Sequence, residues 1–516
     1  MKKRILALVL AVLTAAALCA CGGGKSQEAK PADNPAGSTG EKAQGGEITV
    51  GIAADLDTSL DPHVSSSSAG TREVLFNIFE GLMKPDTDGN LIPAVAESYT
   101  VNEAADAYTF TLRKGVRFHN GQAVTVGDVV YSLSRAAGLE TGEPLVATLS
   151  GVASVEAEGE DKVVVTLKAP DTEFLAYATA AIIPADSDPA QGLIGTGPFR
   201  FVSRVPQESI VLERFADYWG EGAKLDRVTL KVIPDGQTMV LSLRSGAIDM
   251  AGHLEASQAD SLQDLTVLEG SMNLVQALYL NNRVAPFDDV RVRQALCYLI
   301  DKHAVIDLAA DGHGFPVGSS MYPAFGRYFD ETLTDAYTLN VEKAKSLLAE
   351  AGYPNGFRFT ITVPSNYTPH VDAAQVIVNL LDQANIGVSA KIEQVEWATW
   401  YSEVYKEGKF ETTVCGMDAS TLTASAMLSR FTSDSKKNFI GFASPEYDAA
   451  YAAAVSSVDA EAQTAHFKEC EAILSREAAN VYLQDLADFF VLQPNISGYR
   501  FYPLYVMDLS TVYRVS

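Results

Sequence analysis

The sequence predicts an α/β fold arranged in layered lobes, with an α+β subdomain in its first half. Two observations lead to this prediction. From Glu47 onward the composition is globular, and the roughly 470 residues that remain correspond to three domains or two large lobes. Along this stretch, segments with the period of a strand alternate with segments with the period of a helix.

The earliest of these segments predict the subdomain. Residues 108–113 alternate apolar and polar side chains, as a half-buried strand does. Residues 125–128 resemble the capping box that starts a helix. Residues 152–168 contain two further strands separated by a turn. Strands and a helix in this arrangement indicate an α+β subdomain over about residues 72–195.

The later elements follow a β-α-β order. Asn340 is a typical N-cap residue, and Gly352 followed by Pro354 is typical of a helix end. The predicted elements are a strand at 229–233, a helix at 237–244, a strand after Gly246, a helix from Asn340 to Gly352, a strand at 357–363, a helix at 372–385 and a strand at 388–392. Strands joined by helices in this way indicate layered α/β lobes.

The N-terminus resembles the leader of an exported lipoprotein. Residues 2–4 are basic, residues 5–13 are apolar, and Leu18–Cys21 has the Leu-x-x-Cys pattern of a bacterial lipobox. The apolar stretch is shorter than the ~18 residues that a spanning helix needs. We therefore expect residues 1–20 to be a cleaved signal peptide and Cys21 to be lipidated, which would hold the protein on the outer side of the bacterial cell membrane.

Residues 21–46 are expected to form a lipidated, disordered tether. After Cys21 they contain no aromatic residue and no Ile, Leu, Val or Met. Such a segment cannot bury enough apolar area to offset the entropy lost on ordering.

Charge and cysteine content exclude several classes of function. The chain has 39 basic and 65 acidic residues and a net charge of −26; residues 1–20 carry three basic and no acidic residues, so the cleaved chain would carry −26 − 3 = −29. A chain this acidic is not built to bind nucleic acid. Cys297, Cys415 and Cys470 are far apart, which favours buried thiols over a disulfide framework or a zinc site.

Short strings in a fixed order carry a family resemblance from about residue 47 to the C-terminus. They are Leu60–His63, Asn77–Leu82, Pro93–Ser98, Tyr108–Gly121, Asp128–Ser132, Gly195–Phe199, Tyr218–Gly220, Ser245–Asp249, Pro286–Leu296 and Ile300–Lys302. Together they resemble the extracellular solute-binding proteins of family 5, the peptide and nickel group of ABC importers. Most of the strings have a structural explanation as core aromatics, turn glycines and helix starts, so they indicate the fold rather than the ligand.

The resemblance implies a two-lobed, periplasmic-binding-protein-like (Venus-flytrap) fold with the α+β subdomain in its first lobe. Lobe 1 is expected to comprise residues 47–285 and 488–516, and lobe 2 residues 286–487, with chain crossings near 280–283 and 486–492. The implied function is that of a receptor, not an enzyme. It would capture a small-molecule or peptide solute between its lobes and deliver it to ABC permease subunits, as a monomer without a cofactor.

The resemblance also implies where the ligand lies. One wall is the polar segment 64–72, for which a solvated, helix-capping loop is the alternative. The opposing wall is formed by 395–400 and 413–425, where core packing is the alternative for Trp400. The candidate ligand-binding residues are Ser66, Ser67, Thr71, Trp397, Met417, Asp418 and Ser420.

Two departures from the family concern peptide ligands. Peptide binders of this family carry an aspartate that meets the α-ammonium, and an ungapped alignment places Ser420 there; Asp418 could replace it only with a register slip. The arginine that holds a dipeptide carboxylate has no counterpart between Val363 and His370. We therefore do not expect free dipeptides or tripeptides as ligands. The expected ligand is an oligopeptide-like or related solute.

Two alternative functions remain open at this point. No two of the histidines have the spacing of a helical metal-binding pair, so a metal would have to arrive as a nickel or other metal chelate. The histidines are His63, His119, His253, His303, His313, His370 and His466. A secreted hydrolase is the more remote alternative, because nucleophile-elbow and nucleotide-binding motifs are absent but a carboxylate pair is not excluded.

Overall fold

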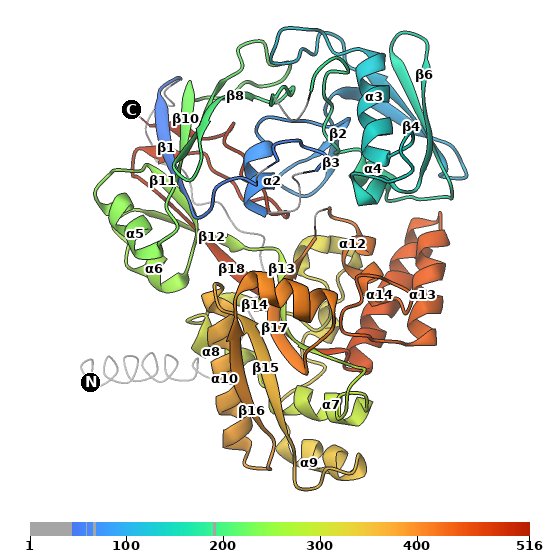
Figure 1. Cartoon of the computed structure of the whole chain (residues 1–516), viewed down its shortest axis with the longest axis vertical. Coiled ribbons are helices and arrows are strands. Elements are labelled where there is room, and N and C mark those ends of the chain that lie inside the picture. The colour runs from blue at the N-terminus through green and yellow to red at the C-terminus, as the bar shows by residue number, and fades with distance from the viewer. Residues whose placement is uncertain (1–43, 58, 65–68, 189–191, 420, 516) are drawn as a thin grey trace, which may run out of the picture. The chain divides into compact units, whose positions relative to one another are not determined.

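The computed structural model describes residues 44–57, 59–64, 69–188, 192–419 and 421–515. A sheet of 12 strands runs through it in the order β16-β15-β17-β13-β18-β11-β1-β10-β9-β8, with β12 and β14 also paired to β18. We call β1 and β8–β12, with the elements packed on them, the first lobe, and β13–β17 with theirs the second lobe (Figure 1).

The strands of this sheet have the following bounds. Those of the first lobe are β1 (Glu47–Ile52), β8 (Phe199–Val205), β9 (Ser209–Arg214), β10 (Arg227–Val232), β11 (Met250–Leu254) and β12 (Thr266–Ser271). Those of the second lobe are β13 (Leu274–Leu280), β14 (Gly314–Pro316), β15 (Arg358–Pro364), β16 (Ser389–Val395) and β17 (Thr412–Asp418), and β18 (Asn480–Leu492) belongs to both.

Strand β18 connects the two lobes. Its residues 480–484 pair with β13, and its residues 487–492 pair with β12. Because β12 ends at Ser271 and β13 begins at Leu274, the partner of β18 changes between these two residues. Leu280, near which the sequence suggested a crossing, is the last residue of β13.

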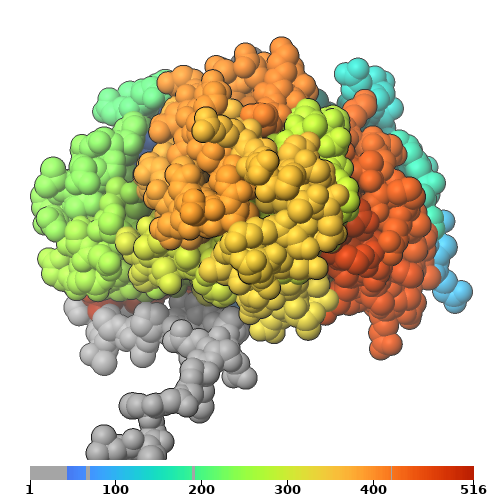
Figure 2. Space-filling view, turned by 90° about the horizontal axis from the view of Figure 1, so that it is seen from below, coloured from blue at the N-terminus to red at the C-terminus, as the bar shows by residue number. Residues whose placement is uncertain are grey.

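Helices cover both faces of the second-lobe strands. Figure 1 shows α10 running along β15–β17, and Figure 2 shows second-lobe residues (yellow to orange) covering much of the face seen from below. The helices are α7 (Val290–Leu299), α8 (Lys302–Ala309), η2 (Pro323–Tyr328), η3 (Glu331–Leu333), α9 (Val341–Glu350), α10 (Thr368–Ala384), α11 (Trp397–Thr399), η4 (Trp400–Lys406), α12 (Ala424–Leu428), η5 (Ser429–Phe431), α13 (Pro445–Ser456) and α14 (Ala460–Arg476).

The predicted α+β subdomain is confirmed as a four-stranded sheet, β4-β5-β7-β6, packed against α3. At the start of α3, the Thr125 hydroxyl accepts from the Asp128 N–H, and an Asp128 carboxylate oxygen accepts from the Thr125 N–H at 2.9 Å. The helix ends at Gly138 (φ 67°), where a side chain would collide with Glu143. The elements are β4 (Ala96–Val101), β5 (Ala107–Leu112), α3 (Val126–Ala137), η1 (Ala147–Leu149), β6 (Val152–Glu158), β7 (Lys162–Leu167) and α4 (Phe174–Tyr177).

The other predicted elements are also confirmed, with one correction. Helix α10 begins at Thr368, four residues before the expected start. Pro369 in its first turn is tolerated because that position needs no backbone donor. The remaining elements are α2 (Ala69–Leu75), β2 (Met83–Pro85), β3 (Leu91–Pro93), α5 (Gly236–Arg244), α6 (Ala256–Asp260), β19 (Ile496–Ser497) and β20 (Tyr513–Arg514).

Cysteines and membrane spans can be assessed only within the described residues. Cys297, Cys415 and Cys470 are buried free thiols, as predicted. None of the helices in the described part of the chain is long and apolar enough to cross a membrane. Cys21 and the predicted signal peptide and tether up to residue 43 lie outside it.

Candidate functional site

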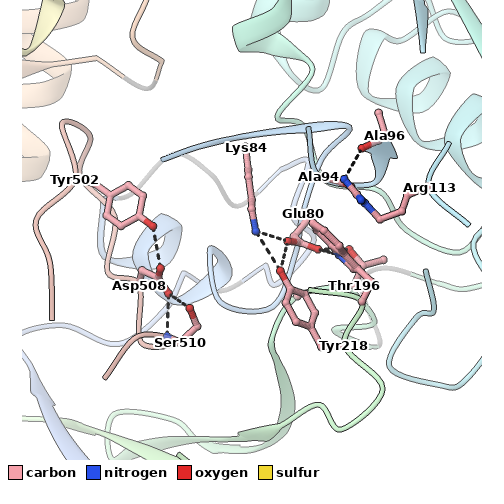
Figure 3. A network of polar contacts seen from close by, with 12 residues as sticks. Glu80, Lys84, Ala94, Ala96, Arg113, Thr196, Tyr218, Tyr502, Asp508 and Ser510 are labelled. Atoms are coloured by element: carbon pink, nitrogen blue, oxygen red, sulfur yellow. Dashed lines mark hydrogen bonds and ion pairs between the residues drawn. The ribbon is translucent and has the colours of Figure 1, made fainter. Parts of the chain in front are cut away.

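A buried carboxylate links two of the sequence strings that carry the family resemblance. Glu80 accepts hydrogen bonds from the Tyr218 hydroxyl and the Trp219 indole N–H, each at 2.7 Å, and from the Lys84 ammonium at 3.1 Å (Figure 3). The guanidinium of Arg113 lies 4.3 Å from the Trp219 ring centroid. These residues therefore support the first lobe, as the structural interpretation of the strings predicted.

Two histidines of these strings are also structural. Arg135 donates to Nδ1 of His63 at 2.8 Å, and Nε2 of His63 donates to the carbonyl of Ala181 at 2.8 Å. His119 contacts the carbonyl of Gly197 at 3.0 Å, and burial lowers its pKa to about 4. Both imidazoles are thus occupied by internal contacts, and no group of three His, Cys, Asp or Glu residues suited to a metal ion occurs among the described residues.

The predicted second wall lies at one edge of the second-lobe sheet. Strand β15 runs parallel to both β16 and β17, so the carboxyl ends of the three strands meet at the same edge. Tyr367 and Trp397 lie in the segments that follow β15 and β16, and Asp418 is the last residue of β17. Edges of this kind are where α/β sheets commonly bind ligands.

Trp397 is partly exposed at this edge, whereas Trp400 is not. The side chain of Trp397 is 43% exposed, stacks on Trp400 with ring centroids 5.1 Å apart, and meets the ring of Tyr367 edge-on at 5.5 Å. Trp400 is buried and donates its indole N–H to Thr413 at 2.9 Å. Core packing, the alternative considered for Trp400, is therefore correct.

An ion pair joins the edge to the first lobe. Nη2 of Arg72, on α2, lies 2.6 Å from Oδ2 of Asp418, which is the last residue of β17. Arg72 belongs to the polar segment predicted as the first wall. The Asp418 carboxylate, which could meet a peptide ammonium only with a register slip, is therefore already paired with a cation of the protein.

The other candidate residues have different environments. Thr71 is buried, and its hydroxyl accepts from the backbone N–H of Asp57 at 2.9 Å. Met417 is buried, and its sulfur lies 3.7 Å from Nη1 of Arg430. Ser66, Ser67 and Ser420 lie outside the described residues.

A second contact between the lobes involves the subdomain. The carboxylate of Glu173 accepts hydrogen bonds from the N–H groups of Ala424 at 2.7 Å and Ser425 at 3.4 Å, in the first turn of α12. Beside it, Gln463 donates to the Thr172 hydroxyl at 2.6 Å. Burial raises the pKa of Glu173 to about 7.

A histidine between two acids lies behind the ion pair. His253, on β11, contacts Glu73 of α2 at 2.7 Å and Asp488 of β18 at 3.0 Å, and its ring stacks on Tyr505 at 4.5 Å. Burial alone would lower the pKa of His253, but the charges and hydrogen bonds of Asp488 and Glu73 raise it well above 6.5. A protonated His253 thus ties α2, which carries Arg72, to the strand that connects the lobes.

Sequence reasoning missed four of these functional positions. Arg72 was inside the predicted wall but was not singled out, although it is the one charged residue of that segment. Glu173 and His253 carried no local signal, because their partners are distant in sequence, and Arg430, 12 residues after Asp418, lies outside the predicted wall.

Known proteins show the same architecture. CtaP from Listeria monocytogenes, an ABC transporter substrate-binding protein, superimposes with a TM-score of 0.83 at 22% identity, over 92% of this chain and 100% of that one. The fold is thus the two-lobed fold of extracytoplasmic solute-binding proteins. Residues 90–439 match the family described as bacterial extracellular solute-binding proteins, family 5 Middle, and the chain belongs to this family.

Two curated relatives cover nearly the whole chain. Heme-binding protein A of Haemophilus influenzae is 30% identical, over 84% of this chain and 86% of that protein. The oligopeptide-binding protein AppA of Bacillus subtilis is 27% identical, over 98% of this chain and 97% of that protein. Family membership makes this chain an extracytoplasmic transport receptor that captures a solute for an ABC importer, and not an enzyme.

Proposed function

We propose that the protein is a lipid-anchored, monomeric receptor that holds its solute at the carboxyl edge of β15–β17, between the two lobes. The observation that carries this proposal is the Arg72–Asp418 ion pair, because it joins the two predicted walls at the strand edge that also carries the partly exposed Trp397. A cleft with one aromatic surface and a few placed charges is typical of small-solute sites.

We further propose that lobe 1 comprises about residues 47–271 and 488–516. The pairing of β18 supports a crossing between Ser271 and Leu274 rather than near 280–283, because all of β13 pairs with second-lobe strands or with residues 480–484 of β18. The second crossing then lies within β18, between about residues 485 and 488. Two short extended crossings are suited to act as a hinge.

The relatives suggest an oligopeptide-like or related solute, since one is named for oligopeptides and another for heme. An unmodified dipeptide is a poor candidate, because its ammonium would have to compete with Arg72 for Asp418. A partly exposed carboxylate such as Asp418 would also stabilise the ammonium little, because an exposed ion pair contributes only about 0 to 1 kcal/mol. The proposed ligand is therefore a solute that does not depend on its ammonium.

Compaction on binding tests the proposed capture. Solute released from natively purified protein and identified by mass spectrometry should, when added back, lower the radius of gyration in small-angle scattering and raise the melting temperature with concentration. Trp397→Ala should weaken its binding by about tenfold or more. Tyr99→Ala, which truncates a similarly exposed aromatic on the subdomain, is the control. Equal binding by both variants would argue against this edge as the site.

Membrane fractionation tests the proposed anchor. Cys21→Ala is expected to yield protein that is released or left unprocessed, because the lipid would have no acceptor thiol. Cys19→Ala, two residues away, is expected to stay bound to the membrane. Equal membrane attachment of the two variants would disprove lipidation at Cys21.

A further inference from the structure

A row of stacked aromatic rings follows an unusual helix. Residues 400–406 form a π-helix, η4, which follows directly on α11. Within this row Trp397 and Tyr401 are 6.1 Å apart with their planes inclined by 22°, and Tyr401 and Tyr405 are 5.6 Å apart with planes inclined by 10°. Trp397 and Tyr401 remain 43% and 42% exposed. Short π-helices are rare and occur frequently at functional sites.

The wider helix explains this alignment. An α-helix places side chains of neighbouring turns three or four residues apart, whereas the π-helix has room for an i, i+5 neighbour as well. Trp400 and Tyr405, five residues apart, are stacked at 6.2 Å, beside the i, i+4 contacts of Tyr401. The rings are nearly parallel, and Trp397 and Tyr401 are the partly exposed members of the row; the Lys406 ammonium lies over the Tyr401 ring, 4.7 Å from its centroid.

A guanidinium without a carboxylate partner adjoins this surface. Arg430 donates to the carbonyl of Asp418 at 3.0 Å and of Ala426 at 3.3 Å, and its Nη1 lies 3.7 Å from the sulfur of Met417. Arg430 also donates a hydrogen bond to the hydroxyl of Tyr405. All four acceptors are neutral, and within the described part of the chain Arg430 forms no ion pair with Asp or Glu.

A second cation lies near Arg430. Lys437 is exposed, and both desolvation and the charge of Arg430 lower its pKa, so the two charges act on each other. Arg430 is only partly exposed, and a partly buried charge is ordinarily paired, because removing it from water is costly. Because Arg430 forms no ion pair among the described residues, it indicates where an anion of the ligand would be stabilised, and Lys437 adds positive charge beside it.

We propose that the solute carries an anionic group, bound by Arg430 with Lys437 beside it, and a planar ring system that lies on Trp397 at the end of the row. This inference rests on the proposed function and specifies the chemical class of its ligand. It agrees with the pairing of Asp418, since the carboxylate at this edge is neutralised by Arg72 and does not repel an anion. A guanidinium binds a carboxylate through two parallel hydrogen bonds, which adds orientation as well as affinity.

A pair of probes with the same ring isolates the anionic group. 2-Naphthoate and 2-naphthamide differ in charge but share the planar system, and both can be followed by quenching of tryptophan fluorescence and by calorimetry. We expect 2-naphthoate to bind at least tenfold more tightly to the wild-type protein. The ratio of the dissociation constants of 2-naphthamide and 2-naphthoate measures this preference. Arg430→Gln should reduce the ratio to about one, Arg430→Lys should retain part of the preference, and Lys437→Gln should lower the ratio.

The neighbouring exposed lysine provides the matched control. Lys436→Gln should leave the ratio unchanged, because it removes an exposed lysine charge without altering Arg430 or Lys437. A purely structural role of Arg430 would weaken both probes equally and leave their ratio intact, which would overturn the proposal. Failure of both probes to bind, or equal binding of both, would overturn it as well.

The failure of this inference can be distinguished from that of the proposed function. If the naturally bound solute causes compaction but proves neutral, the function stands and the inference fails. If no released solute causes compaction, the proposed capture itself fails.

Discussion

Replacing His253 by asparagine is expected to lower the melting temperature by about 5 °C or more, since breaking a buried charge network costs about 3 to 5 kcal/mol. Asparagine suits the backbone, because His253 has φ 58°, a region that asparagine tolerates. The variant leaves the carboxylates of Glu73 and Asp488 without the cation between them. Scanning calorimetry measures the change.

A triple variant separates charge from packing. Adding Glu73→Gln and Asp488→Asn to His253→Asn removes both stranded charges, so much of the lost stability should return. A triple variant that is less stable than His253→Asn would show that uncompensated carboxylate charges are not the cause of the instability of His253→Asn.

The pH dependence of this network has a defined sign. Because the folded protein raises the pKa of His253 well above 6.5, the stabilisation is fully present below pH 6.5 and is lost as the pH rises through the folded-state pKa. The difference in melting temperature between the wild type and His253→Asn should therefore narrow above pH 6.5. A difference that widens toward alkaline pH would contradict a protonated His253.

Local elements were predictable from the sequence because their determinants are local. The capping box of Thr125 and Asp128 and the N-cap at Asn340 are complete within four residues, and both helices begin where predicted. Helix α10 was predicted to begin four residues too late, although proline, as at position 369, is favoured in a first turn. Alternation of apolar residues likewise located the strands of the subdomain.

The site was predictable only in part, because its contacts join distant segments. Arg72 and Asp418 are separated by 346 residues, and His253 is separated from Asp488 by 235. The periodicity of a sequence does not show which distant segments lie side by side. The two walls of the site could therefore be predicted only from the family resemblance. The row of rings on η4 could not be predicted for another reason, because nothing in the sequence of Trp397–Lys406 distinguishes a π-helix from an α-helix.

Solute affinity is expected to weaken by about tenfold or more as the pH is raised from about 5 to 8, through Glu173. Burial raises the pKa of this carboxyl to about 7, and Asp171 adds to the increase, although the N–H groups of Ala424 and Ser425 favour the charged form. The other titratable groups that act on it are tyrosines and not cations. They are Tyr177, Tyr328 and Tyr451.

The direction of this pH dependence follows from comparing the closed and open arrangements of the two lobes. Opening separates Glu173 from α12 and exposes it, so its pKa should return toward 4.5, the ordinary value. Closure of the lobes is therefore accompanied by protonation of Glu173. Above pH 7 the charge on Glu173 makes closure less favourable, by up to about 3 kcal/mol, and this free-energy cost decreases to zero as the pH falls to 4.5. Closure and solute binding are linked, so affinity carries the same dependence.

Glutamine at position 173 should abolish this dependence. Glu173→Gln keeps an oxygen to accept from Ala424 but cannot ionise, so calorimetric titrations at pH 5 and pH 8 with the released solute should give nearly equal affinities. Glu160→Gln, which neutralises an exposed acid in the turn between β6 and β7, should retain the wild-type dependence. If Glu173→Gln and the wild type lose affinity in parallel as the pH rises, the solute or another group titrates, and Glu173 does not control closure.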